Sequence, residues 1–82
     1  MSSNYQVYGI YEKDELLYIG ATTNSLAVRL GKLYVEYGLL SHYMRSKSRE
    51  LFSIRCLYQC KSKKTMLHNK KELITQLKPK MN

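Results

Sequence analysis

The chain has 82 residues, which is enough for one small domain with a modest hydrophobic core. Hydrophobic residues make up 44% of it, an ordinary share for a globular protein that argues against a disordered chain. The 14 Lys and Arg residues against 6 Asp and Glu give a formal net charge of +8, so we expect polyanionic partners, nucleic acid first and an anionic membrane surface second.

The sequence contains no membrane or secretion signal. No apolar run approaches the roughly 20 residues of a membrane span. The first four residues lack the basic and apolar regions of a signal peptide. We therefore expect a single domain over residues 1–82, located in the cytoplasm and without a membrane partner.

Two β-rich runs at the start of the chain predict a hairpin, with strands over residues 5–11 and 16–21 and a polar turn between them. Each run carries a tyrosine close to a glycine, Gly9 in the first and Gly20 in the second. Glycine in a strand often marks a close approach of another backbone or a ligand. The pattern indicates either a polar shelf on the sheet or a plain hairpin with half-buried tyrosines.

The middle of the chain predicts two helices. Four residues that commonly cap helices, at positions 22–25, precede apolar residues at helical spacing, which are Leu26, Leu30, Leu33, Tyr34 and Tyr37. Gly38 is the expected stop. Residues 39–47 predict a second, shorter helix with Ser41 as its cap.

The last third predicts a strand and a helix. Residues 51–60 alternate in polarity and place Phe52, Ile54, Cys56 and Tyr58 on one face. Ser62 is the expected cap of a final helix that ends at residue 77 or 78, before Pro79. The order β-β-α-α-β-α predicts an α+β domain in which helices cover the apolar faces of a small three-stranded sheet.

The two cysteines do not indicate a disulfide or a metal site. Cys56 and Cys60 would lie about 13 Å apart along a strand, too far for a disulfide. The two cysteines and the two histidines, His42 and His68, are not spaced along the chain as the paired ligands of a zinc site are. We interpret both as small core residues.

Two tripeptides connect the chain with a known family. Gly9-Ile10-Tyr11 and Tyr18-Ile19-Gly20, in this order and at hairpin distance, resemble the name-giving motifs of the GIY-YIG endonuclease superfamily. Arg29, His42 and a closing Pro-x-x-Asn run at residues 79–82 extend the resemblance over nearly the whole chain. It implies an antiparallel sheet flanked by helices and a metal-dependent phosphodiesterase that acts on DNA.

Arg29 is the first candidate site residue. It lies three residues after Leu26 and four before Leu33, on the apolar face of its helix. A guanidinium there is costly unless it is paired or meets an anion, and no carboxylate is an obvious local partner. Its planar fork suits a phosphate, whereas the alternative is an arginine that snorkels from the edge of the core. The resemblance favours a phosphate clamp.

The resemblance also implies that Tyr11 or Tyr18 activates or orients the attacking water, and the sequence does not distinguish between them. His42, with an ordinary pKa close to neutral, could relay a proton or serve only structurally. Three further motif residues are expected to support the site: Gly9, Gly20 and Asn82.

Position 70 departs from the family pattern. It lies on the apolar stripe of the last helix, four residues after Met66 and four before Ile74. The resemblance implies a glutamate here that binds the divalent metal, Mg²⁺ or Mn²⁺. Lys70 has no acceptor atom, so it cannot replace a carboxylate on a hard cation. An active form should need that metal, and the chain as written should not bind it.

Three explanations for Lys70 remain open: an inactivated nuclease variant, a naturally degenerate member that binds nucleic acid without cutting it, or another acid that serves in its place. We favour the first, because Tyr11, Tyr18, Arg29 and Asn82 all fit the pattern. The predicted function is a metal-dependent DNA endonuclease, catalytically impaired as written; the alternative is a non-catalytic nucleic-acid-binding or inhibitor module. Without a separate DNA-reading module, specificity must be low or come from a partner or a homodimer.

Overall fold

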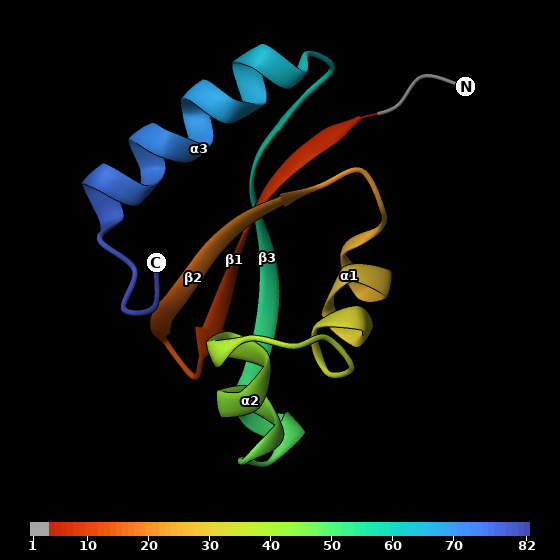
Figure 1. Cartoon of the computed structure of the whole chain (residues 1–82). Helices are drawn as coiled ribbons and strands as arrows, with labels where there is room; N and C mark the ends of the chain where they lie inside the picture. Colours follow the sequence, from red (N-terminus) through yellow and green to blue (C-terminus); the bar gives the residue numbers. More distant parts are fainter. Residues whose placement is uncertain (1–3) are drawn as a thin grey trace.

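A computed structural model describes residues 4–82 (Figure 1). Its elements are β1 Tyr5–Glu12, β2 Glu15–Thr22, α1 Leu26–Leu33, α2 Leu39–Arg45, the short 3-10 helix η1 Arg49–Leu51, β3 Phe52–Cys60 and α3 Lys63–Leu77. The strands form one antiparallel sheet with β1 in the centre, in the order β2-β1-β3. The predicted α+β fold and element order are confirmed.

The helices cover the two faces of the sheet separately. On one face Tyr8 of β1 packs in a cluster with Leu33 at the end of α1 and Met44 of α2. On the other face Val7 packs with Met66 of α3. Successive strand residues point to opposite faces, so adjacent Val7 and Tyr8 belong to different clusters. Figure 1 shows the same division, with α3 on one side of the sheet and α1 and α2 on the other.

Two of the helix caps predicted from the sequence are present. The Ser25 hydroxyl accepts a hydrogen bond from the Val28 N–H at 3.3 Å, and the Ser62 hydroxyl accepts one from the Thr65 N–H at 3.4 Å. Lys78 ends α3 in the left-handed conformation, with φ 48°. Among residues 4–82, no helix combines the length and apolar character that a bilayer crossing requires.

Two details of the middle helices differ from the prediction. α1 ends at Leu33, so Tyr37 lies outside it and is 99% exposed instead of facing the core. Ser41 is not a cap, because α2 begins after Gly38 and Ser41 is buried within the helix. Gly38 has φ +133°, a backbone conformation open mainly to glycine.

A bulge in β3 breaks the predicted alternation. Val7 pairs with Tyr58, whereas the next residue, Tyr8, pairs with Cys56, so Leu57 is the extra residue. Tyr58 consequently packs with the α3 cluster and not with the residues at the start of the strand. Cys56 is exposed with a free thiol, so its prediction as a core residue is wrong.

The C-terminal residues run along the outer edge of β2 (Figure 1). The Met81 N–H donates to the Leu17 carbonyl at 2.7 Å. The Asn82 side-chain amide accepts from the Ile19 N–H at 2.7 Å and donates to the Ile19 carbonyl at 3.1 Å. These contacts satisfy backbone groups of an edge strand on both sides of Tyr18.

Candidate active site

Arg29 of α1 reaches over the sheet to Tyr8. Its Nε donates a hydrogen bond to the Tyr8 hydroxyl at 3.0 Å, and the guanidinium carbon lies 5.9 Å from the centre of the Tyr8 ring. Its Nη1 and Nη2 donate to the two carboxylate oxygens of Glu36 at 2.7 and 3.2 Å. The second hydrogen on each Nη is not used in these contacts and can serve a ligand.

Glu36 is the partner that the sequence analysis missed. Glu36 lies seven residues after Arg29, a spacing of about two helical turns. The two side chains therefore lie on the same side of the segment that runs from α1 into the turn after it. The expectation that no local carboxylate pairs with Arg29 is wrong. A search at seven-residue spacing, and not only at three and four, would have found it.

The charge states of Arg29 and Tyr8 follow from these contacts. Partial burial opposes the positive charge of Arg29, but hydrogen bonds to Glu36 and Tyr8 outweigh it and raise the pKa of Arg29 above its usual range. Burial raises the pKa of Tyr8 although the hydrogen bond from Arg29 acts in the opposite direction. At neutral pH Arg29 is a cation, and Tyr8 is a neutral phenol that can still donate its own proton.

Gly20 provides the space for this arrangement. It pairs directly with Tyr8 across the β1–β2 ladder. A Cβ at Gly20 would lie 2.6 Å from Cζ of Tyr8 and 2.9 Å from Cε2 of Tyr18. The Tyr8 ring therefore crosses β2 where a side chain is absent, and its centre lies 6.4 Å from that of Tyr18.

An open hollow of about 290 Å³ lies beside the Arg29 guanidinium. Its walls come from β2, α1, the segment that joins α1 to α2, α2 itself and the C-terminal tail. The principal lining residues are Tyr18, Arg29, Glu36, Tyr37, Leu39 and Met81. The wall of the hollow thus contains two tyrosines, an arginine and a glutamate, together with apolar side chains.

Tyr11 does not belong to this group. Tyr8 and Tyr11 are three residues apart on one strand, so their side chains point to opposite faces. The Arg55 guanidinium lies over the Tyr11 ring, 4.5 Å from its centre. The tyrosine that joins Tyr18 and Arg29 is Tyr8. The sequence signal that could have identified Tyr8 was its position opposite Gly20 in the hairpin, on the same face as Tyr18.

Two other candidates are also outside the hollow. His42 is exposed on α2 and is not one of the lining residues. Gly9 pairs with Ile19 and not with Gly20, and a Cβ there would lie 3.0 Å from Leu16 Cδ1 on the α3 face. The two motif glycines therefore do not form a common shelf.

Lys70 is half-buried on α3, on the stripe between Met66 and Ile74, as its spacing predicts. α3 packs on the sheet face opposite to the Tyr8 cluster, and Lys70 does not line the hollow. Asn82, by contrast, anchors the C-terminus next to Tyr18 through the backbone of Ile19.

The residues present do not fit the divalent metal that the resemblance implies for an active form. Residues 4–82 contain no group of three His, Cys, Asp or Glu side chains arranged to hold a metal ion. Glu36 is the one carboxylate among the lining residues of the hollow in this part of the chain, and both of its oxygens are engaged by Arg29. Mg²⁺ and Mn²⁺ need oxygen ligands, and Lys70 supplies none.

Comparisons of the chain with protein-family models, with curated proteins and with solved structures gave no match.

Proposed function

We propose that the chain is a nuclease domain of the GIY-YIG type that binds DNA phosphodiesters in the hollow, and that Lys70 leaves it catalytically impaired. The observation that supports this most is the fixed guanidinium of Arg29, which is hydrogen-bonded to Tyr8 beside Tyr18 and borders an open hollow. The net charge of +8 makes a polyanion the natural ligand.

Arg29 is suited to a phosphate. Glu36 occupies the fork formed by Nη1 and Nη2, but one hydrogen on each Nη is not used by Tyr8 or Glu36, so each Nη can donate a single hydrogen bond to a phosphate oxygen. The buried Tyr8 hydroxyl does not line the hollow, and its part is to accept the hydrogen bond that holds Nε of Arg29 in place. Glu36 competes for the guanidinium, so a phosphate must share Arg29 or displace the carboxylate.

The two tyrosines take different roles in this proposal. Tyr8 has a raised pKa, so it is a poor base, and its hydroxyl supports Arg29 by accepting the hydrogen bond from Nε. Tyr18 borders the hollow with its ring next to that of Tyr8, so its hydroxyl is the candidate for orienting a water molecule toward the phosphorus. Of the two tyrosines that the motif left open for this role, Tyr11 and Tyr18, the proposal keeps Tyr18.

Hydrolysis lacks one component in this chain. A divalent metal would stabilise the charge that develops on the phosphate oxygens, but the residues present do not form its site. We therefore expect the chain as written to bind DNA and to cut it negligibly.

Plasmid nicking tests the proposal. We expect no nicking by the chain as written with Mg²⁺ or Mn²⁺. Chelator-sensitive nicking by Lys70→Glu would show that a carboxylate at position 70 supplies the missing metal ligand, although this position does not line the hollow. The matched control is Lys71→Glu, which makes the same charge change at the adjacent, exposed position of α3 and should not nick. In the Lys70→Glu background, Tyr18→Phe and Arg29→Ala should lower the rate about 100-fold or more, whereas Tyr11→Phe should have little effect.

Two results would contradict this proposal. If the chain as written already nicks DNA and a chelator stops it, another residue binds the metal and the assignment of position 70 is wrong. If Lys70→Glu is folded and binds DNA but does not cut supercoiled, linear or branched DNA, the chain is not an inactivated nuclease.

The second candidate function is a nucleic-acid-binding module without chemistry. It is favoured by the pairing of Glu36 with Arg29, because this neutralises the carboxylate in the wall of the hollow. DNA binding by Lys70→Glu without cleavage, lost in Arg29→Ala, would support this candidate over the nuclease.

A further inference from the structure

The segment between α1 and α2, together with Leu39 at the start of α2, carries the most exposed large apolar side chains of the described residues. Val35 is 75% exposed, Tyr37 99% and Leu39 84%, and all three lie within five residues. Single exposed apolar residues are common, but a group of three beside a hollow is typical of a contact surface. Glu36, between the first two, turns back toward Arg29.

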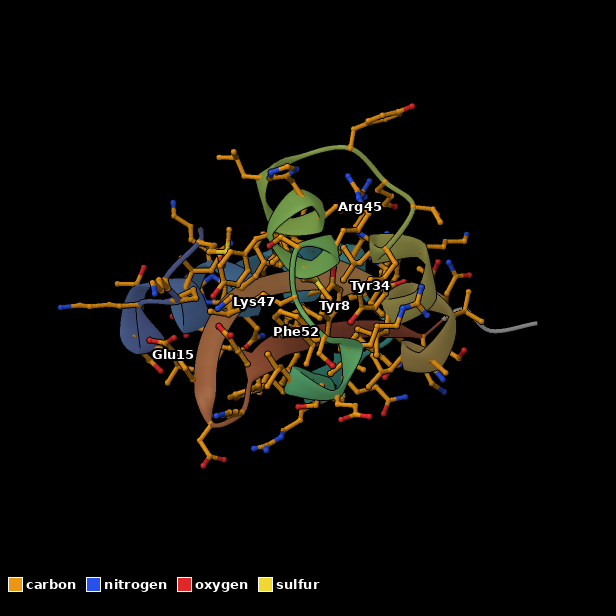
Figure 2. The ribbon with its side chains drawn as sticks, turned by 90° about the horizontal axis from the view of Figure 1, so that it is seen from below. Tyr8, Glu15, Tyr34, Arg45, Lys47 and Phe52 are labelled. Atoms are coloured by element: carbon orange, nitrogen blue, oxygen red, sulfur yellow. The ribbon has the colours of Figure 1, made fainter. Side chains whose placement is uncertain are left out.

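The backbone of this segment is held from both sides. Arg45 of α2 donates from Nη1 to the carbonyls of Tyr34 at 3.2 Å and Glu36 at 2.7 Å. Figure 2 shows Arg45 and Tyr34 next to each other at this end of the molecule. The Glu36 side chain is fixed by Arg29. Tyr37 therefore extends into solvent from an anchored backbone, which lowers the entropy that a ligand contact would cost.

Tyr37 and Leu39 line the same hollow as Arg29. We propose that Tyr37 stacks on an unpaired base of a nucleic acid whose phosphate binds at Arg29, with Leu39 against the same nucleotide. This rests on the proposed function and specifies its substrate class, which is DNA with at least one unstacked nucleotide, such as a single strand, a flap or a bulge.

An aromatic ring can stack only on a base face that is free. Both faces of a base within a duplex are covered by its neighbours, whereas an unpaired base offers one. Stacking of this kind tolerates any base, which suits a small domain without a separate reading module. The net charge of +8 favours a polyanion over an apolar protein as the occupant of the surface.

The test measures affinity by fluorescence anisotropy for a short labelled single strand and for the same strand in a full duplex. Tyr37→Ala should weaken single-strand binding by at least about fivefold and change duplex binding by less than about twofold. Tyr37→Phe should keep the affinity, because the ring is retained. Val28→Ala is the matched control, because Val28 is an exposed apolar residue of α1 that neither belongs to this group nor lines the hollow.

A spectroscopic readout checks the stacking itself. The chain contains no tryptophan, so Tyr37→Trp introduces a single reporter at this position. Its emission should be quenched by the single strand with the same concentration dependence as the anisotropy. No quenching at a concentration that saturates binding would overturn the proposal.

The variants separate this inference from the function on which it rests. If Arg29→Ala weakens single-strand binding and Tyr37→Ala does not, stacking fails and phosphate binding stands. If neither variant changes it, the proposed function fails as well. Concentration-dependent self-association that Tyr37→Ala abolishes would assign the segment to a contact between two copies and overturn the stacking proposal.

Discussion

Arg29 illustrates how single residues define the site. An arginine on the inner face of a helix needs partners for its charge. The sequence suggested a ligand phosphate as the partner, but the structure pairs Arg29 with Glu36, two turns further on. The guanidinium thus has a protein partner and keeps donors for an anion, so structural and ligand-binding roles coexist in one side chain.

Gly20 provides a prediction at this scale. Gly20→Ala places a Cβ against the Tyr8 ring, which is only 1% exposed and cannot swing into solvent. We expect a loss of about 1–3 kcal/mol in the free energy of unfolding, measured by urea denaturation. Displacement of Tyr8 should also weaken DNA binding, since the hydroxyl that positions Arg29 moves.

Gly31→Ala is the matched control for that change. Gly31 lies on the exposed side of α1, and the methyl group of an alanine there would have no neighbouring atom within 4 Å. Alanine is the better helix former by about 0.5–1 kcal/mol, so this variant should be as stable as the parent or more stable. Equal behaviour of the two variants would contradict the packing described for Gly20.

The tyrosines show what the motif could and could not predict. The tripeptides correctly drew attention to the hairpin, and Tyr18 does border the hollow. Tyr11 does not, because a strand alternates its faces and Tyr8, three residues earlier, lies opposite Gly20. The sequence shows which residues of a strand share a face. It does not show which helices cover that face, because this depends on how distant segments pack.

At the scale of elements, local signals predicted the order of strands and helices and the caps at Ser25 and Ser62. The β3 bulge at Leu57 was not predictable, because it depends on how β3 pairs with β1 and not on the composition of β3. The early end of α1 was missed because Tyr37 continues the apolar spacing, although the backbone has already left the helix.

A polar cluster joins α2 to the hairpin and gives a pH prediction. Lys47, just after α2, donates to Glu12 at the end of β1 at 2.8 Å, and the Tyr43 hydroxyl donates to the other oxygen of the same carboxylate at 2.5 Å. Lys47 also lies over the Tyr43 ring, 4.7 Å from its centre. These hydrogen bonds lower the pKa of Glu12 below its ordinary value of 4.5.

The sign of the effect on stability follows from linkage. Because the folded-state pKa of Glu12 is below that of the unfolded chain, its contribution is complete above the unfolded value and is lost as the pH falls through the folded one. Chemical denaturation of the parent from about pH 6 to about pH 3 should show this loss. Glu12→Gln should show a smaller loss, whereas Asp14→Asn, exposed in the same hairpin, should behave like the parent. Parallel curves for the parent and Glu12→Gln would contradict the role of the cluster.

The whole molecule is a positively charged domain with its candidate site on one face of the sheet. α1, α2 and the C-terminal tail build the hollow, whereas α3 covers the opposite face. A net charge of +8 attracts DNA in any orientation, so affinity alone cannot identify the site. The site can be identified by comparing the DNA affinities of variants that lack one of two arginines on opposite faces of the sheet, because removing either arginine changes the total charge by the same amount.

We propose above all that Arg29 binds a DNA phosphate in the hollow. The most direct test of this is to measure how DNA affinity depends on salt concentration for Arg29→Gln and for Arg55→Gln. Both variants lose one charge, but Arg55 stacks on Tyr11 away from the hollow. Circular dichroism checks that both are folded. We predict that Arg29→Gln weakens binding more and lowers the slope of log affinity against log salt by about one phosphate contact, roughly 0.7–0.9 units. Equal losses of affinity and equal slopes for the two variants would contradict the claim.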